Sequence, residues 1–351
     1  MRELKYSQAI LEATDLCMEK DPTVYLMGLG VPDPKGVFGT TAGLQKKYGE
    51  KRVFDMPTSE NGMTGIAIGS ALTGMKPLMV HQRIDFALLA MEQIVNQAAK
   101  WNYMFGGQQS IPLVIRLIIG QGWGQGPQHS QSLQAWFAHI PGLKVVMPTT
   151  AYDAKGMLIA AIEDPNPVIF LEHRWLHNTT GDVPEGHYTV PLGKSKVVRV
   201  GSDLTVVATS NMVLEAIKAA EILKEVGVQT EIIDVRSLRP LDEEPILNSV
   251  RKTGHLIVAD NAWKSCGFAS EVVALAAEKA FSSLKRPPER VTQPDVPSPA
   301  TPALANDFFP RGKDIVEAAE KVLGLTIDNN LKFSRDPKLL DIPDKNFTGP
   351  F

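Results

Sequence analysis

The sequence has little cysteine and no long uncharged apolar run. Cys17 and Cys266 are the only cysteines among 351 residues. They are too few and too far apart for a disulfide framework or a cysteine-ligated metal site, which fits a reducing cytoplasm. No uncharged apolar stretch reaches the ~18 residues that a transmembrane helix needs. The N-terminal stretch mixes acids and bases and does not have the form of a signal peptide. We therefore expect a cytoplasmic protein that makes no contact with a membrane.

Neither positive nor negative charge is in large excess, and the commonest catalytic motifs are missing. The chain has 36 Lys and Arg against 39 Asp and Glu, a formal net charge of −3, and its basic residues are spread along the sequence. This balance argues against a nucleic acid as partner. There is no Ser nucleophile elbow, no HExxH, no CxxC and no GxxxxGK[ST] phosphate loop. The sequence therefore excludes several hydrolase, zinc and nucleotide-binding classes.

Helical and strand patterns alternate along the chain, as they do in parallel sheets covered by helices on both sides. With 44% hydrophobic residues, 351 residues are too many for one ordinary core. We predict an α/β protein of two domains, each a mostly parallel sheet flanked by helices. The predicted boundaries are a first domain at 1–180, a linker at 181–200, a second domain at 201–325 and an extended tail at 326–351.

Several elements are expected from the patterns of apolar residues. Residues 111–118 (IPLVIRLI) form a near-continuous apolar run, which is typical of a strand buried on both faces. Residues 86–105 have helical spacing and predict one long helix. The stretch 177–200 is rich in glycine, proline and turn residues and shows no helix signal. The proline-rich stretch 286–304 excludes a regular helix over its length.

Glu60 is the first candidate for a catalytic residue. It lies in PTSENGMTGIAIGSALTG, directly before an expected helix rich in glycine and alanine. In one interpretation Glu60 only favours the positive N-terminal end of that helix. In the other, the small residues let the helix pack very close to a neighbour. A carboxylate in such a tight apolar place exchanges a proton near neutral pH.

His129 is the second candidate, at the end of a glycine-rich loop in PQHSQS. Such a loop before a helix can hold a phosphate, although the fingerprint spacings are missing. A single loop histidine is more often structural than catalytic. The residues alone therefore indicate an acid/base pair of Glu60 and His129 without naming a reaction.

Charged residues also gather at a strand-to-helix turn, in HQRIDF at 81–86. His81, Arg83 and Asp85 are either solvated there or face a ligand, because this end of the strands binds ligands in doubly wound sheets. Phe86, which begins the next helix, has core packing as its simplest role.

The stretch IEDPNPVIF at 162–170 offers oxygen atoms from Asp164, Asn166 and nearby carbonyls. One interpretation is a turn stabilised by the Asp side chain, and the other is a site for a hard cation. The residues leave both open.

Taken together, these stretches resemble a known family. The ordered set that carries the resemblance is PTSENGMTGIAIGSALTGMKP, DFALLAMEQIVNQAAK, QHSQSLQAWFAHIPGLKVVMP, DAKGMLIAAIEDPNPVIFLE, DVRSLRPLD and GKDIVEAAEKVL. It resembles the β subunit of the E1 component of 2-oxoacid dehydrogenase complexes, a thiamine-diphosphate-dependent group that covers the pyruvate, branched-chain and acetoin enzymes. The resemblance runs from about residue 4 to 324. It implies a transketolase-like pyrimidine-binding domain followed by a transketolase-type C-terminal domain.

The resemblance also implies roles for single residues. Glu60 matches the acid that hydrogen-bonds N1′ of the thiamine aminopyrimidine and so promotes loss of the thiazolium C2 proton. Phe86 matches an aromatic residue against the pyrimidine, and Leu29 matches a position in the cofactor environment. His129 matches a histidine that assists acyl transfer to a lipoyl arm. In some members a structural potassium ion is bound at the positions that match Leu113, Ala161, Ile162, Asp164 and Asn166.

The resemblance has a consequence for partners. Thiamine enzymes bind the diphosphate through Mg²⁺ with a GDG motif and a downstream Asn pair, and this chain contains no GDG. In the family a separate E1 α subunit supplies that half of the site. The resemblance therefore implies an α2β2 heterotetramer, a small 2-oxo acid as substrate and a lipoyl-bearing E2 as acceptor.

Two departures from the family keep other functions open. Relatives often have two acids where this chain has Leu29 and Gly30, and they have less charge at 81–85. Arg83, with His81 beside it, is either a ligand for an anionic group of the substrate or a contact to the α subunit. The alternatives are one half of a split transketolase-like enzyme without a lipoyl protein, and a non-catalytic scaffolding subunit.

Overall fold

The structure is a computed structural model that describes residues 2–120, 124–328 and 342–343. Its contacts divide the chain into two compact units. Among the described residues, unit 1 holds 2–120 and 136–192, and unit 2 holds 124–135, 193–328 and 342–343. The expected α/β fold with two domains is confirmed. By its contacts, the segment 124–135 belongs to unit 2, although it lies within the first predicted domain in the sequence.

Unit 1 is built on a parallel sheet with the strand order β6-β7-β5-β4-β2-β3. A separate antiparallel pair is formed by β1 and β8. The strands are β1 (Arg2–Lys5), β2 (Val24–Gly28), β3 (Val53–Phe54), β4 (Lys76–His81), β5 (Val114–Ile119), β6 (Lys144–Val146), β7 (Val168–His173) and β8 (Thr180–Val183).

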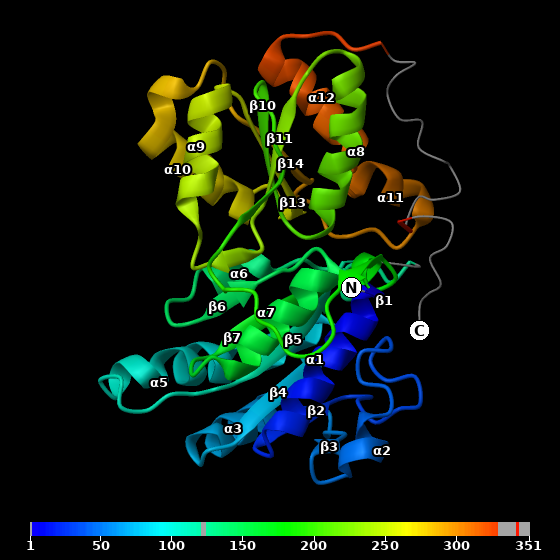
Figure 1. Cartoon of the computed structure of the whole chain (residues 1–351), viewed down its shortest axis with the longest axis vertical. Coiled ribbons are helices and arrows are strands. Elements are labelled where there is room, and N and C mark those ends of the chain that lie inside the picture. Colours follow the sequence, from blue (N-terminus) through cyan, green and yellow to red (C-terminus); the bar gives the residue numbers. More distant parts are fainter. Residues whose placement is uncertain (1, 121–123, 329–341, 344–351) are drawn as a thin grey trace. The chain divides into compact units, whose positions relative to one another are not determined.

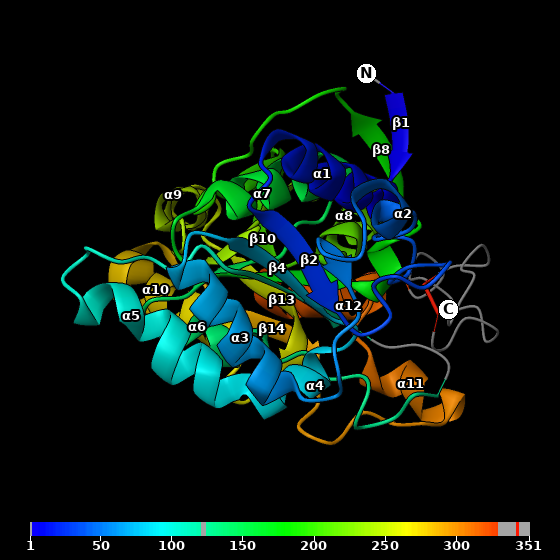
Figure 2. The ribbon, with the colours of Figure 1, turned by 90° about the horizontal axis from the view of Figure 1, so that it is seen from below.

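Helices cover both faces of this sheet. Helices α1 and α7 lie on one face and α3 and α5 on the other, with β2 and β4 between them (Figure 2). The helical elements of unit 1 are α1 (Tyr6–Lys20), α2 (Leu44–Tyr48), α3 (Glu60–Leu72), α4 (Ile84–Ala87), α5 (Ala99–Met104), α7 (Ala151–Glu163) and a 3-10 turn (Arg174–Leu176). Helix α6 (Gln134–Ala138) includes the point where the chain passes from unit 2 to unit 1. All residues of β5 and β7 are buried, and most of them are apolar, as expected for strands covered on both faces.

Unit 2 has a second sheet with the order β14-β13-β10-β11-β9, in which only β9 is antiparallel. The strands of this sheet are β9 (Lys196–Arg199), β10 (Leu204–Ala208), β11 (Thr230–Asp234), β13 (Leu256–Trp263) and β14 (Glu289–Gln293), and β12 (Ser237–Arg239) of unit 2 lies outside it. The helical elements of unit 2 are α8 (Asn211–Glu225), α9 (Glu243–Thr253), α10 (Phe268–Ala280), a 3-10 turn (Phe281–Ser283), α11 (Pro302–Phe308) and α12 (Gly312–Leu323). Figure 1 shows α8 and α12 on one side of the sheet and α9 and α10 on the other.

Some expected elements differ in the structure. The region expected to be one long helix contains α4, a 3-10 turn (Leu88–Ala90), a π-helical stretch (Gln93–Ala98) and α5. Helical spacing does not separate these types, because their hydrogen bonds differ by only one residue. The stretch 177–200, expected to be irregular, contains β8 and β9, which pair with strands far away in the sequence.

The predicted domain boundaries and the extended tail stay predictions. Most of the tail lies outside the described residues. Helix α11 begins within the proline-rich stretch, at Pro302, which occupies the first helical turn. Proline fits there because the first amides of a helix have no partner within the helix.

Candidate active site

The candidate site lies where four adjacent strands of unit 1 end. Strands β7, β5, β4 and β2 are neighbours and run parallel. They end at His173, Ile119, His81 and Gly28. Ligands of open α/β sheets bind outside the carboxyl ends of the strands. The residues that directly follow these ends are therefore the first candidates for binding and catalysis.

Glu60 is the first residue of α3, and its side chain is buried, with 6% of the residue exposed. Its backbone carbonyl accepts a 2.7 Å hydrogen bond from Thr64, whose hydroxyl also contacts Met79 Sδ of β4 at 3.4 Å. The carboxylate makes no hydrogen bond or ion pair with the described residues. A buried carboxylate without such a partner is an acceptor that a ligand donor can satisfy.

The glycines after Glu60 are less closely packed than expected. A Cβ atom added at Gly65 would lie 3.4 Å from Gln93 Oε1, an ordinary contact, and one added at Gly69 would meet no atom within 4 Å among the described residues. The side chain of Ile66 is 59% exposed on the same helix. The described residues of unit 1 therefore do not pack closely against Gly65 and Gly69, and part of the helix surface is uncovered by them.

Leu29 directly follows β2 and is half-buried. Its carbonyl accepts a 2.9 Å hydrogen bond from Gln82 Nε2, a side chain that directly follows β4. A Cβ at Gly30 would lie 2.5 Å from the same nitrogen, so glycine is required for this approach. Phe86 lies in α4, four residues after Gln82, and is half-buried. Local chain contacts thus place Leu29, Gln82 and Phe86 at the ends of two adjacent strands.

His81 and Arg83 are both buried, at 2% and 4% exposure. Burial lowers the pKa of His81 to about 4, so its imidazole is neutral at pH 7. Burial also lowers the pKa of Arg83 to about 10, and the charge of Asp85 partly offsets this effect. The Arg83 guanidinium donates to the Gly120 carbonyl, and its Nε lies 3.9 Å from Asp85 Oδ2. Of the two interpretations left open by the sequence, the one in which these charges are solvated is therefore wrong.

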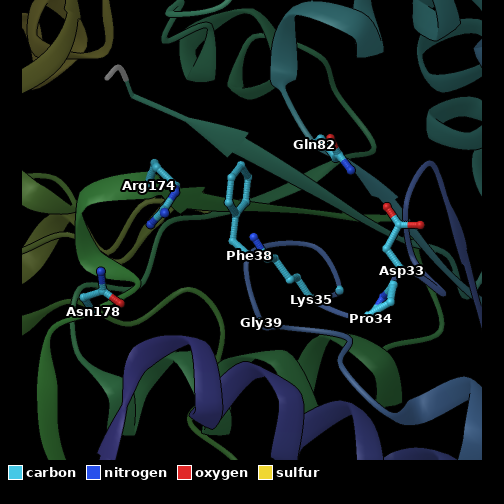
Figure 3. A pocket seen from close by; sticks show the side chains of 9 residues that line it. Asp33, Pro34, Lys35, Phe38, Gly39, Gln82, Arg174 and Asn178 are labelled. Carbon is cyan, nitrogen blue, oxygen red and sulfur yellow. The ribbon is translucent and has the colours of Figure 1, made fainter. Parts of the chain in front are cut away.

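Sequence reasoning missed Arg174, which directly follows β7 and is 3% exposed. Its guanidinium stacks over the Phe38 ring at 4.4 Å from the centroid. Figure 3 shows the two side chains next to each other at a cavity of about 740 Å³, which Gln82, Asp33, Lys35 and Asn178 also line. The signal in the sequence was a basic residue directly after a buried strand.

A buried ionic network supports this edge of the sheet. The Arg116 guanidinium of β5 donates to both carboxylate oxygens of Glu172 on β7, one at 2.9 Å, and to Thr40 Oγ1 at 2.8 Å. Burial alone would raise the pKa of Glu172, but Arg116 and His177 outweigh it and lower the pKa to about 2. The bond to Thr40 ties the loop that carries Phe38 to the sheet.

His129 is half-buried and belongs to unit 2, whereas Glu60 belongs to unit 1. The pairing of these two side chains therefore stays a prediction. Within unit 2, Gln134 Nε2 donates a 2.8 Å hydrogen bond to Asp260 Oδ1, at the end of the segment that carries His129. Ser298 Oγ also contacts the Ser130 carbonyl at 3.4 Å.

The residues of the predicted potassium site make other contacts in the structure. Asp164 forms an ion pair with Lys144 and accepts a 2.9 Å hydrogen bond from the Asn166 amide, the Asp-stabilised turn that was the alternative. The carbonyls of Leu113 and Ala161 accept backbone hydrogen bonds at 2.9 and 3.3 Å, and Ile162 is buried nearby in α7. Within the described residues, no group of three or more His, Cys, Asp or Glu side chains could hold a metal ion. The potassium site stays a prediction.

None of the helices in the described part of the chain is both long and apolar enough to span a membrane.

Family models match the two halves of the chain. Residues 2–179 match the model "Transketolase, pyrimidine binding domain", and residues 193–315 match "Transketolase, C-terminal domain". A solved structure titled "Split gene transketolase, inactive beta4 tetramer" is similar with a TM-score of 0.75 and 23% identity, over 92% of this chain and 99% of that one. These matches define a protein built of transketolase-like domains.

Curated relatives narrow the class. The β subunit of acetoin:2,6-dichlorophenolindophenol oxidoreductase from Cupriavidus necator is 44% identical over 332 residues, which cover 92% of this chain and 98% of the relative. Subunit beta-1 of the mitochondrial pyruvate dehydrogenase E1 component from Arabidopsis thaliana is 42% identical over 324 residues, which cover 91% and 89%. The chain therefore belongs to the family of E1 β subunits of 2-oxoacid and acetoin dehydrogenases.

Proposed function

We propose that the chain is the β subunit of a thiamine-diphosphate-dependent E1 that decarboxylates a 2-oxo acid and transfers the acyl group to a lipoyl carrier. The observation that carries this proposal is Glu60, a buried carboxylate at the start of α3 with no hydrogen-bond or ionic partner among the described residues. When bound, thiamine diphosphate supplies the carbon nucleophile and the electron sink for decarboxylation. The residues at the carboxyl ends of β2 and β4 fit its aminopyrimidine end.

Glu60 accepts a hydrogen bond from the aminopyrimidine in this proposal, and its burial strengthens that bond. Phe86 offers a ring face and Leu29 an apolar side chain beside the same ring. His81, neutral at pH 7 because of burial, and Arg83 face the substrate. His129 holds or passes a proton during acyl transfer to the lipoyl arm.

The proposal includes an E1 α subunit as partner, in an α2β2 heterotetramer, because the chain lacks the GDG motif that holds the diphosphate and Mg²⁺. Exposed apolar side chains support such a partner, since Ile66 on α3 is 59% exposed and Leu89 in the following helical region is 64% exposed. Surfaces of this kind mark interaction sites. The proposal also includes a lipoyl-bearing E2 as acceptor, a cytoplasmic location and a structural potassium ion at Asp164.

The test is an affinity purification of this chain from its native lysate, followed by assays of the recovered complex. The expected result is a stoichiometric partner that carries GDG and the Asn pair, with turnover of a 2-oxo acid that requires thiamine diphosphate and a lipoyl domain. A chain recovered alone or only as a self-dimer would instead favour the non-catalytic scaffolding subunit.

The buried arginines near β4 and β7 favour a second candidate, one half of a split transketolase-like enzyme that acts on sugar phosphates, because guanidinium groups recognise phosphates. The same recovered complex distinguishes the two. Turnover with sugar phosphates alone, and none with 2-oxo acids and lipoyl domain, would replace the first candidate with the second.

A further inference from the structure

Arg174 and Arg83 bring two buried positive charges to one end of the sheet in unit 1. Arg83 follows β4 and Arg174 follows β7, and they are 4% and 3% exposed. The pKa of Arg174 is lowered to about 10, first by burial and then by the positive charge of Arg83. The two guanidinium groups are therefore close enough to repel each other.

Two buried like charges are costly unless an anion offsets them. Asp85 lies 3.9 Å from Arg83 Nε, beyond hydrogen-bond distance. Arg83 Nε and Nη1 have no hydrogen-bond partner among the described residues, although both are buried. Donors of this kind are usually satisfied in folded proteins. Arg83 therefore keeps two buried donors, beside the charge of Asp85, that an anionic ligand can satisfy.

The cavity beside Arg174 has the size and lining for such a group. Its volume is about 740 Å³, within the range of small-molecule sites. The Phe38 ring holds the plane of the Arg174 guanidinium from one side, and Arg116 anchors that loop through Thr40. Figure 3 shows Arg174 and Asn178 on one side of Phe38 and Gln82 and Asp33 on the other. The lining combines the Arg174 guanidinium and Lys35 with two amides and one acid, Asp33. A fixed guanidinium beside amides is suited to the oxygens of a carboxylate or phosphate.

Gln82 connects this cavity with the proposed cofactor site. Its amide lines the cavity and donates a 2.9 Å hydrogen bond to the carbonyl of Leu29. An amide nitrogen carries two hydrogens, so one remains for a ligand in the cavity. Gln82 therefore contacts both Leu29, at the proposed cofactor site, and the cavity that Arg174 lines.

We propose that this cavity binds a second anionic group of the acyl substrate, so that the enzyme selects 2-oxo acids whose far end is a carboxylate or a phosphate. This inference rests on the proposed function, since it assigns the substrate class of that site. Arg174 acts as the specificity residue and contacts the anionic end directly. Arg83 supports it with a second positive charge close by.

The first experiment compares three probes with the recovered complex of this chain and its partner. 2-Oxopentanoate and 2-oxoglutarate have the same chain length and differ at the far end, methyl against carboxylate. 3-Phosphooxy-2-oxopropanoate offers a phosphate instead, and so separates the two anion sources. We expect kcat/KM for one anionic probe to exceed that for 2-oxopentanoate by about 100-fold or more, because a buried polar site rejects an analogue without the matching group.

Two substitutions at Arg174 and one control test the residue itself. Arg174→Gln is expected to remove the preference, with kcat/KM falling about 100-fold for the anionic probe and little for 2-oxopentanoate. Arg174→Lys keeps the charge without the planar fork and is expected to restore part of the preference. Arg251→Gln, on the exposed face of α9, is the matched control and is expected to leave all three values unchanged.

A binding measurement on the purified full chain does not depend on turnover. We expect succinate or inorganic phosphate to raise the thermal unfolding midpoint by a few degrees relative to sodium chloride of equal ionic strength. Arg174→Gln is expected to lose this shift, and the unfolding midpoint without ligand shows whether that variant is folded.

The outcomes separate the inference from the proposed function. Turnover of 2-oxopentanoate equal to or faster than that of both anionic probes would overturn the inference and leave the proposed function intact. A second outcome is that none of the three probes is turned over, while phosphate or succinate still raises the unfolding midpoint and Arg174→Gln abolishes this rise. That outcome would refute the 2-oxo acid reaction and retain the anion site. Equal shifts in the wild type and in Arg174→Gln would overturn the anion site itself.

Discussion

The side-chain amide of Gln134 donates a 2.8 Å hydrogen bond to Asp260 Oδ1, and the Thr209 hydroxyl donates to the same oxygen at 2.8 Å. Asp260 lies in β13 and is fully buried. Through Gln134 it anchors the segment 124–135, which carries His129, to the sheet of unit 2.

Replacing Asp260 by Leu should loosen that segment. The substitution removes the acceptor and leaves the Gln134 amide buried without this partner, which costs about 1–3 kcal/mol. Hydrogen–deuterium exchange of the amides at 124–133 should become faster than in the wild type. Asp260→Asn keeps an oxygen acceptor and should show a much smaller change. If Leu and Asn variants exchange at the same rate as the wild type, the anchor has no effect on the segment.

Glu172 should contribute strongly to stability above pH 4.5. Its Glu172→Gln substitution leaves Arg116 buried without its charged partner, which costs about 3–5 kcal/mol. The pKa of Glu172 is lowered in the folded state, so its contribution is complete above the unfolded value near 4.5 and is lost as pH falls toward 2. Urea unfolding at pH 7, 4.5 and 3.5 measures this: the difference between wild type and variant should be largest at pH 7 and shrink below 4.5. A difference that stays constant across this range would contradict the assignment.

Gly120 should not tolerate a methyl group, because of its neighbour as well as its backbone. Its φ is +83°, and an added Cβ would lie 2.7 Å from the ring of His173. Gly227 has nearly the same φ, +84°, and an added Cβ there meets no atom within 4 Å in the described structure. Gly120→Ala should therefore cost about 1–3 kcal/mol more than Gly227→Ala, which isolates the steric contribution. Equal changes in the urea midpoint would show that the ring moves away freely.

His129→Ala should separate the two halves of the proposed reaction. If His129 assists acyl transfer, the variant complex should lose more activity with lipoyl domain as acceptor than with an artificial electron acceptor, by about 10-fold or more. Decarboxylation itself should change little. Equal losses in both assays would remove this role from His129.

The fold was largely predictable from the sequence, because buried runs such as IPLVIRLI and the regular alternation with helices depend on local patterns. Strands β8 and β9 were not predicted. They are short, partly exposed, and formed by pairing with distant strands. Pairing of this kind leaves little trace in a local pattern of residues.

The site was predictable only in part. Glu60 and Arg83 stand in unusual local sequence surroundings, so both could be predicted as candidate site residues. Arg174 and Phe38 are 136 positions apart. Only the strand order β7-β5-β4-β2 brings the ends of distant segments together, and that order is set by the packing of the whole sheet. A cavity that depends on such contacts is invisible to residue-by-residue reasoning.

The most direct test of the central claim is the exchange rate of the thiamine C2 proton in the complex of this chain with its partner, followed by NMR in deuterated buffer. If the Glu60 carboxylate activates the cofactor, Glu60→Gln should slow this exchange by about 100-fold or more, with the assembly unchanged by size-exclusion chromatography. Glu50→Gln, at an exposed position, serves as the control and should exchange like the wild type. An exchange rate in Glu60→Gln equal to that of the wild type would contradict the account.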